Sequence, residues 1–259
     1  MFRPRKALTN PNLLSLRRRG IYLLPNLLTT AALFSGFYAI VQAMNQNFEY
    51  AAMAIFLAML FDGLDGRVAR LTRTQSAFGA EYDSLSDMVS FGAAPALIVY
   101  EWAFKDIGKW GWIAAFVYCA GTALRLARFN TNMDVVDKRY FQGLPSPAAA
   151  ALVAGFVWIV QDLGLTGEEV RWYAFALTLF AGMTMVSTLH YWSGKDINLR
   201  RSIPFMAVPL IVLGYALVWS YPPGVLFALF LCYACSGYIN ALWQWSPKRK
   251  VEIPPISCD

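Results

Sequence analysis

The sequence contains little charge for a chain of 259 residues: only 15% of it is Asp, Glu, Lys or Arg, while 58% is hydrophobic. A soluble domain of this length needs more charge on its surface. Several apolar runs approach the ~20 residues that a helix needs to cross a bilayer. The shortage of charge therefore excludes an ordinary soluble domain and predicts an integral membrane protein built from α-helices.

Cysteine and histidine are also scarce. Among the four cysteines, Cys232 and Cys235 form a CxxC pair in an apolar stretch, with no second pair or histidine cluster beside it. Small core residues are the simplest interpretation, so no disulfide framework is expected. A lone histidine, His190, is more typical of a structural hydrogen bond than of catalysis. The basic first 22 residues lack a compact apolar core, so no cleavable signal peptide is expected.

The apolar segments predict about eight transmembrane helices in a single domain, because neither an internal repeat nor a linker is visible. They are expected at residues 22–43, 48–70, 80–104, 110–130, 146–163, 169–190, 202–220 and 223–244. Thr166 and Glu169 offer a capping box before the sixth helix. Pro222 and Pro223 predict a tight turn before the last one.

The distribution of Lys and Arg predicts the topology. Counted by loop, 19 of the 22 Lys and Arg residues fall on one side, and only Lys105, Lys109 and Arg171 fall on the other. Cytoplasmic loops carry this excess, so both termini are expected in the cytoplasm. The positive net charge then reflects topology and membrane lipids, and no nucleic-acid partner is expected. The basic segment 1–21 either lies along the anionic membrane surface or serves only as a topology signal.

Four aspartates stand at helical spacing near the cytoplasmic ends of two neighbouring segments. Asp62 and Asp65 are three residues apart, and Asp83 and Asp87 are four apart, so each pair shares a helix face. Two antiparallel helices would bring all four carboxylates together. Repulsion and desolvation would make such a cluster unfavourable without a cation. Oxygen ligands suit Mg²⁺ or Mn²⁺, so the spacing predicts a metal site.

A simpler interpretation is that these carboxylates are solvated and paired with Arg67 and Arg70. The neighbouring glycines argue against it. Gly63 and Gly66 each cost about 1 kcal/mol in a helix interior relative to alanine, and glycine lets a ligand approach the backbone closely. An arginine such as Arg70 can hold a phosphate. Together these residues favour a diphosphate site at the membrane surface.

The stretches DGLDGRVAR (62–70) and GAEYDSLSD (79–87) resemble the complete signature of the CDP-alcohol phosphotransferase family. The eight signature positions are Asp62, Asp65, Gly66, Ala69, Arg70, Gly79, Asp83 and Asp87. The resemblance implies a membrane enzyme, usually a homodimer, that moves a phosphatidyl or similar group from a CDP-linked donor to an alcohol and releases CMP. It also implies a six-helix catalytic core at residues 22–190, followed by two further helices (191–244) and a cytoplasmic tail (245–259).

The resemblance further implies a role for each signature residue. Asp62, Asp65 and Asp83 would bind two Mg²⁺ or Mn²⁺ ions, and Asp87 would either join them or act alone as the general base. The cytidine and diphosphate of the donor would bind at Gly66, Ala69, Arg70 and Gly79.

Three other stretches lie on the same predicted side: LPNLLTT (24–30), RLARFN (125–130) and GLPSPAAA (143–150). They resemble the membrane-embedded bacterial phosphatidylserine synthase branch of the family. This implies CDP-diacylglycerol as donor, L-serine as acceptor and the bacterial inner (cytoplasmic) membrane as location. The pocket for serine would use Arg125, Arg128, Phe129 and Asn130. Topology alone would also place two arginines there.

Two alternatives remain at this point. Another acceptor, such as glycerol-3-phosphate, inositol phosphate or choline, would keep the aspartate site but change the pocket around Arg125 and Arg128. A cation transporter would instead place its carboxylates near the middle of the bilayer, commonly between repeats. The aspartates here cluster at one membrane face, and no repeat is visible, which favours the enzyme.

Overall fold

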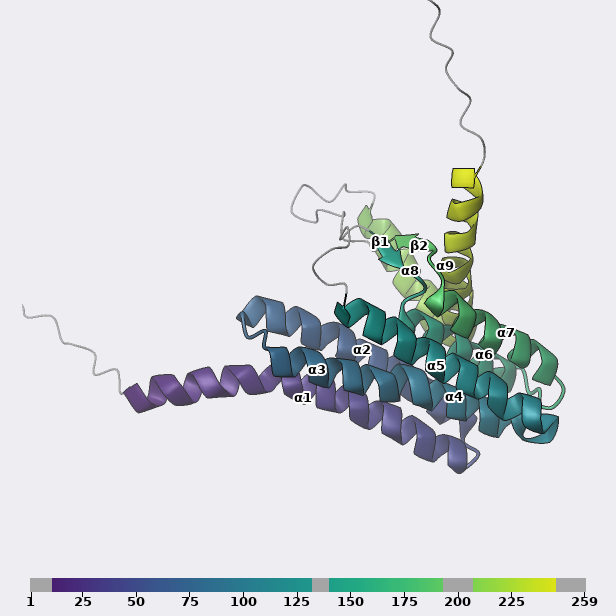
Figure 1. Cartoon of the computed structure of the whole chain (residues 1–259), viewed down its shortest axis with the longest axis horizontal. Coiled ribbons are helices and arrows are strands. Elements are labelled where there is room, and N and C mark those ends of the chain that lie inside the picture. Colours follow the sequence, from purple (N-terminus) through teal and green to yellow (C-terminus); the bar gives the residue numbers. More distant parts are fainter. Residues whose placement is uncertain (1–10, 132–139, 193–206, 246–259) are drawn as a thin grey trace, which may run out of the picture.

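The computed structural model describes residues 11–131, 140–192 and 207–245, and helices dominate these ranges (Figure 1). In order, the elements are α1 (Pro11–Met44), α2 (Phe48–Thr72), α3 (Ala77–Asp87), η1 (Met88–Ala93), α4 (Ala94–Val99), η2 (Tyr100–Phe104), η3 (Lys105–Ile107), α5 (Lys109–Thr131), β1 (Tyr140–Gln142), α6 (Ser146–Asp162), α7 (Arg171–Val186), β2 (His190–Trp192), α8 (Ala207–Ser220) and α9 (Pro222–Trp245). Several parts of the predicted cytoplasmic face lie outside the described residues: positions 1–10, the tail 246–259, Lys138, Arg139, Lys195, Arg200 and Arg201.

Each of the eight predicted segments contains a helix over most of its described residues. The sixth was expected to reach residue 190, but α7 ends at Val186 because Ser187 takes an extended conformation and leads the chain towards β2. Before α7, the Glu169 carboxylate accepts a hydrogen bond of 2.9 Å from the Thr166 backbone N–H. This is one half of the predicted capping box.

The third predicted segment is one helical path interrupted by two π-helical stretches, η1 and η2. Pro95 has no N–H to donate to the carbonyl of Phe91, four residues earlier. The buried Tyr118 hydroxyl of α5 donates to that carbonyl instead, at 3.0 Å. The wider turn η1 begins directly after Asp87, and such turns frequently mark functional sites.

Helix α1 approaches the α3–η1 path closely enough to form hydrogen bonds between the two. Gly36 makes this possible, since a Cβ there would lie 2.6 Å from the Cα of Ser90. The Ser90 hydroxyl donates to the Ala32 carbonyl at 3.1 Å, and the Ser86 hydroxyl donates to the Thr29 carbonyl at 3.2 Å. These bonds set how α1 is rotated, and they bring Thr29 of α1 next to Asp65 of α2.

Small residues also allow close packing elsewhere in the bundle. A Cβ on Gly121 of α5 would lie 2.7 Å from the carbonyl oxygen of Gly182 on α7. On α6, a run of alanines is buried: Ala148, Ala149, Ala150, Ala151 and Ala154. Close approach through small side chains is characteristic of helix packing in membrane proteins.

The helical fold is confirmed, and it carries one small addition that the sequence did not predict, the two-stranded antiparallel ladder β1–β2. Phe141 pairs with Tyr191 at its centre. Gly143 follows β1 with a positive φ of 77°, and its N–H donates to the Leu189 carbonyl at 2.8 Å. Strands of three residues are too short to give an alternating pattern that sequence analysis can detect.

The helices have the character of a membrane protein. Leu24–Met44 in α1 and Pro222–Trp243 in α9 are long and apolar enough to cross a bilayer, and α6 is apolar but shorter. Large apolar side chains, such as Phe34 and Phe37, are exposed on the outside of the bundle. In Figure 1, α1 projects beyond the other helices at its N-terminal end, and α9 rises at a steep angle to them. Eight membrane crossings remain a prediction.

Candidate active site

Three of the four predicted aspartates come together between α2 and α3. One carboxylate oxygen each from Asp62, Asp83 and Asp87 lies within 4.8 Å of the others, and all three residues are half-buried. The four-residue spacing on α3 puts Asp83 and Asp87 on one face, and the antiparallel α2 presents Asp62 to that face. The spacing argument therefore predicted the proximity of these three.

The turn between α2 and α3 fixes this arrangement through its caps. Arg73 ends α2 in the left-handed conformation, with φ 53°. Its N–H bonds the Arg70 carbonyl at 3.3 Å and the Thr74 N–H bonds the Ala69 carbonyl at 3.1 Å, which is the Schellman pattern of a helix end. Ser76 then caps α3 by accepting a hydrogen bond of 3.0 Å from the Gly79 N–H.

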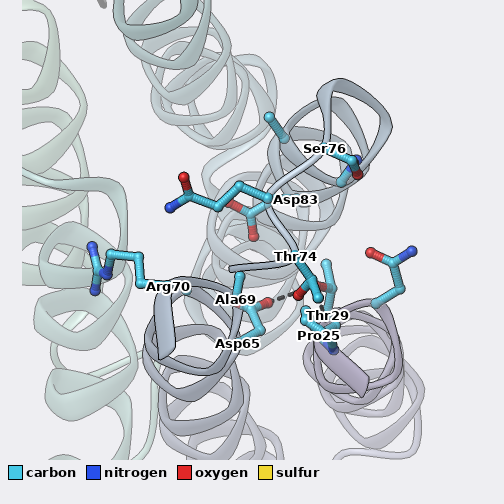
Figure 2. Close-up of a pocket in the computed structure, with 13 residues that line it drawn as sticks. Pro25, Thr29, Asp65, Ala69, Arg70, Thr74, Ser76 and Asp83 are labelled. Atoms are coloured by element: carbon cyan, nitrogen blue, oxygen red, sulfur yellow. Dashed lines mark hydrogen bonds between the residues drawn. The ribbon is translucent and has the colours of Figure 1, made fainter. Parts of the chain in front are cut away.

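The fourth predicted ligand, Asp65, is held separately. It is almost fully buried, with 5% of its surface exposed, and its carboxylate accepts a hydrogen bond of 2.6 Å from the Thr29 hydroxyl (Figure 2). Within the described residues it is not one of the carboxylates that lie within 4.8 Å of one another. Asp65 and Asp83 nevertheless line the same pocket, so Asp65 borders the cluster without joining it.

That pocket lies between the middle of α1, the end of α2 and the start of α3, and it has a volume of about 370 Å³. Its wall contains all four residues predicted to hold the CDP moiety: Gly66, Ala69, Arg70 and Gly79. A Cβ on Gly66 would meet no atom within 4 Å. This glycine therefore leaves open space beside the helix backbone, which a bound molecule can approach. The exposed Arg70 side chain extends away from Asp65 at the rim (Figure 2).

Several pocket residues were not predicted as site residues. They are Pro25, Asn26 and Thr29 from α1, Thr74, Gln75 and Ser76 from the turn, and Ala80 from α3. The available signal was the polar start of an apolar segment in LPNLLTT, where Asn and Thr are costly in a membrane unless they serve a site. The sequence predicted this stretch on the same side as the aspartates, and it lines the same pocket as Asp65 and Asp83, but the sequence gave no partner for it.

The carboxylate cluster fits a hard divalent cation. Among the described residues, Asp83 Oδ1 is buried and has no hydrogen-bond partner. A buried carboxylate oxygen without a partner beside two further carboxylates is unfavourable, because desolvation and repulsion add. A cation bound by Asp62, Asp83 and Asp87 would satisfy this oxygen, and an all-oxygen ligand set suits Mg²⁺ or Mn²⁺.

The residues predicted for an acceptor pocket separate into different environments. Arg125 donates from Nη1 to the Ser146 hydroxyl at 2.8 Å, while its Nε is buried and bonds none of the described groups. Arg128 donates to the carbonyls of Val186 and Ser187 at the end of α7, at 3.0 and 3.4 Å. The guanidinium of Arg128 therefore supports a helix end, whereas Arg125 has unused donor capacity.

The other two acceptor candidates differ again. Asn130 donates to the Ser84 hydroxyl at 3.1 Å, which links α5 to the aspartate helix. Phe129 is 51% exposed on the outside of α5. The charge of Arg125 also interacts with the carboxylate of Asp87 in the aspartate cluster.

Comparison with known proteins agrees with this geometry. The family model of the CDP-alcohol phosphatidyltransferases matches residues 22–186, from the first predicted membrane helix to the end of α7. The chain belongs to this family. The resemblance seen in the aspartate signature is therefore confirmed, while α8 and α9 lie outside the matched region.

Three relatives from different organisms share one enzyme name. A CDP-diacylglycerol–serine O-phosphatidyltransferase of Helicobacter pylori is 34% identical over 225 residues, covering 86% of this chain and 92% of the relative. One from Mycobacterium bovis is 32% identical over 238 residues, covering 88% and 76%. One from Saccharomyces cerevisiae is 42% identical over 151 residues, covering 53% and 54%.

Proposed function

We propose that the chain is a phosphatidylserine synthase, which transfers the phosphatidyl group of CDP-diacylglycerol to the hydroxyl of L-serine and releases CMP. The observation that carries this proposal is the position of Asp83, which belongs both to the three-carboxylate cluster and to the wall of the pocket. A nucleotide in that pocket would have its diphosphate beside the cluster. The shared name of the H. pylori, M. bovis and yeast relatives supports serine as the acceptor.

In this proposal the donor lies across α2 and α3. The cytidine would occupy the pocket beside Gly66, Ala69 and Gly79, and Arg70 would turn inward from the rim to pair with a phosphate oxygen. Two Mg²⁺ or Mn²⁺ ions at Asp62, Asp83 and Asp87, with Asp65 at the edge, would neutralise the diphosphate and stabilise the departing CMP.

The chemical step follows from the placement of the remaining groups. The serine hydroxyl attacks the phosphorus that carries the diacylglycerol, its proton passes to the Asp87 carboxylate, and the bond from that phosphorus to CMP breaks. The new phosphorus–oxygen bond gives phosphatidylserine, and CMP carries away the negative charge. Arg125 would hold the serine carboxylate, since its Nε bonds none of the described groups.

The membrane arrangement proposed from the sequence accompanies this function. Eight helices would cross the inner membrane with both termini and the aspartates on the cytoplasmic side, because 19 of the 22 Lys and Arg residues fall there. The exposed apolar surface of the bundle would face lipid, or a second copy of the chain in a homodimer. Residues 22–190 would form the catalytic core.

A test of the acceptor uses the purified protein in detergent with CDP-diacylglycerol and Mg²⁺ or Mn²⁺. L-Serine, glycerol-3-phosphate, inositol phosphate and choline are supplied in separate reactions, and released CMP and the lipid product are measured. We expect CMP release and phosphatidylserine only with serine. Turnover with a different alcohol would refute the acceptor but keep the transferase, and no turnover with any of them would refute the transferase.

The donor pocket can be tested by comparing two glycines of the same helix. Gly66→Ala is expected to raise KM for CDP-diacylglycerol on the order of tenfold, because the new methyl group occupies space reserved for the nucleotide. Gly63→Ala is the matched control: a Cβ there also meets no atom within 4 Å, but Gly63 does not line the pocket. Both changes should stabilise α2 slightly. Equal KM values for the two variants would contradict the assignment of the pocket.

A further inference from the structure

Thr29 of α1 carries a buried hydroxyl in the wall of the pocket. The residue is 4% exposed, and it lines the pocket together with Asp65 and Asp83. Its hydroxyl oxygen lies 2.6 Å from Asp65 Oδ2 and 3.1 Å from the Pro25 carbonyl oxygen (Figure 2). A polar group buried this deeply in a membrane protein costs free energy unless it is hydrogen-bonded, so the partner of this hydroxyl matters.

The proton of the Thr29 hydroxyl goes to Asp65. A hydroxyl has one proton and can donate fully to only one of two acceptors. The 2.6 Å contact has the length of a hydrogen bond from a hydroxyl to an ionised carboxylate, which is the stronger kind. The 3.1 Å contact to Pro25 is the ordinary back-bond of a threonine in a helix. Thr29 therefore donates to Asp65, and the contact with Pro25 is secondary.

The backbone of Thr29 is bonded to the other aspartate helix. Its carbonyl accepts a hydrogen bond of 3.2 Å from the Ser86 hydroxyl of α3, and Ser86 directly precedes Asp87. The side chain of Thr29 thus bonds α2 while its carbonyl bonds α3. Because the donor is fixed between the two helices, the Asp65 carboxylate that it holds is fixed relative to the cluster.

A cation at the cluster has room for Asp65 as a further ligand. Asp62, Asp83 and Asp87 offer oxygens within 4.8 Å of one another, and Mg²⁺ takes about six oxygen ligands in a near-octahedral set. A carboxylate has two oxygens with several lone pairs, and the bond from Thr29 uses only part of this capacity. Asp65 can therefore bind a cation at the edge of the pocket that it shares with Asp83.

We propose that Thr29 is a positioning residue of the cation site: its hydroxyl holds the Asp65 carboxylate where it ligates a cation at the edge of the cluster. This rests on the proposed function, in which the cation serves the diphosphate of the donor. A carboxylate that is already oriented loses less freedom when it binds a metal. Loss of a partner that orients a metal ligand typically weakens metal binding about 10–100-fold.

The test compares two neighbouring threonines of α1. Thr29→Val removes the hydroxyl and keeps the branched shape, and it is expected to raise the Mn²⁺ concentration at half-saturation about tenfold or more. Thr29→Ser keeps a hydroxyl and should restore most of the affinity. Thr30→Val is the matched control: Thr30 has the same kind of back-bond, to Asn26 at 2.7 Å, and contacts the Tyr82 hydroxyl of α3 at 2.9 Å, but it does not line the pocket.

Binding is measured on the purified full-length protein in detergent without either substrate, from the EPR signal of free Mn²⁺ and from the rise in Tm on adding Mn²⁺. Melting temperatures in a chelator establish that each variant folds, and Thr29→Ala takes the place of Thr29→Val if the valine variant does not. Wild-type affinity in Thr29→Val would overturn the proposal. An equal loss in Thr30→Val, or a loss in Thr29→Ser as large as in Thr29→Val, would do the same.

A second comparison shows whether Thr29 acts through Asp65. In Asp65→Ala the three clustered carboxylates remain to bind a cation, but Thr29 has no carboxylate to hold. Thr29→Val should then change the affinity for Mn²⁺ by less than about twofold, because two residues that act as a unit have non-additive effects. A loss as large in Asp65→Ala as in wild type would show that Thr29 acts by another route and would overturn the proposal.

Failure of the proposed function would appear differently. If wild type turned over only another alcohol, serine would be the wrong acceptor, but the role of Thr29 would stand, because neither substrate enters the binding measurement. If wild type bound no Mn²⁺ at all, the cation site and the role of Thr29 would fall together.

Discussion

Replacing Asp87 with asparagine is expected to lower kcat for CMP formation by on the order of 10²–10⁴-fold, the usual effect of removing a general base. Asparagine keeps the size of the side chain but cannot take the proton of the attacking hydroxyl. Asp87 belongs to the carboxylate cluster and is within electrostatic range of Arg125. CMP release from CDP-diacylglycerol and serine measures the effect.

Glu81→Gln is the matched control for this experiment. Glu81 lies on the same helix, is exposed and is not a member of the cluster, so its neutralisation should leave kcat close to wild type. The dependence on Mn²⁺ concentration then separates the two roles open to Asp87. An unchanged midpoint in Asp87→Asn indicates a base that binds no metal, and a raised midpoint indicates a ligand. Wild-type kcat in Asp87→Asn would refute both roles.

The positions of the helices and of three aspartates could be derived from sequence because both depend on local spacing. Apolar length determines where a membrane helix forms, and the spacing of Asp83 and Asp87 determines that they share a face. Because the turn of residues 73–76 is short, α3 runs antiparallel to α2. This direction brings Asp62 close to Asp83 and Asp87. No long-range packing information was needed for this part of the site.

The surroundings of Asp65 could not be derived in the same way. Its spacing from Asp62 predicted a fourth ligand, but its partner is Thr29 on α1. That pairing depends on the rotation of α1, which is set by Gly36 and by the hydroxyls of Ser86 and Ser90. Several different rotations of an apolar helix satisfy the same hydropathy pattern. The sequence therefore could not indicate which residue of α1 would face Asp65.

The partners of the two arginines predicted for the acceptor pocket could not be derived from sequence either. Arg125 and Arg128 are three residues apart and looked equivalent in the sequence, yet one meets Ser146 and the other meets the last carbonyls of α7. Their difference arises from the neighbouring helices and not from the motif. Contacts between segments this far apart in the chain leave no periodic signal in it.

Removing divalent cations is expected to abolish activity and also to destabilise the folded protein. In a chelator, the carboxylates of Asp62, Asp83 and Asp87 have no cation between them, and repulsion and desolvation both oppose the fold. Adding Mg²⁺ or Mn²⁺ at about 100 times its dissociation constant should raise Tm by roughly 5 °C or more. Thermal unfolding in detergent, followed in the same samples as CMP release, measures both effects.

Asp83→Asn makes this prediction specific to the cluster. The substitution removes one of the mutually repelling charges and replaces the buried oxygen that lacks a partner with an amide group. Without metal, the variant should therefore melt at a higher temperature than wild type, although it should gain less on adding Mn²⁺ and should be inactive. Glu81→Gln should behave as wild type in every condition. A metal-induced rise in Tm that is as large in Asp83→Asn as in wild type would place the cation elsewhere, because a site that loses a ligand cannot keep its full binding free energy.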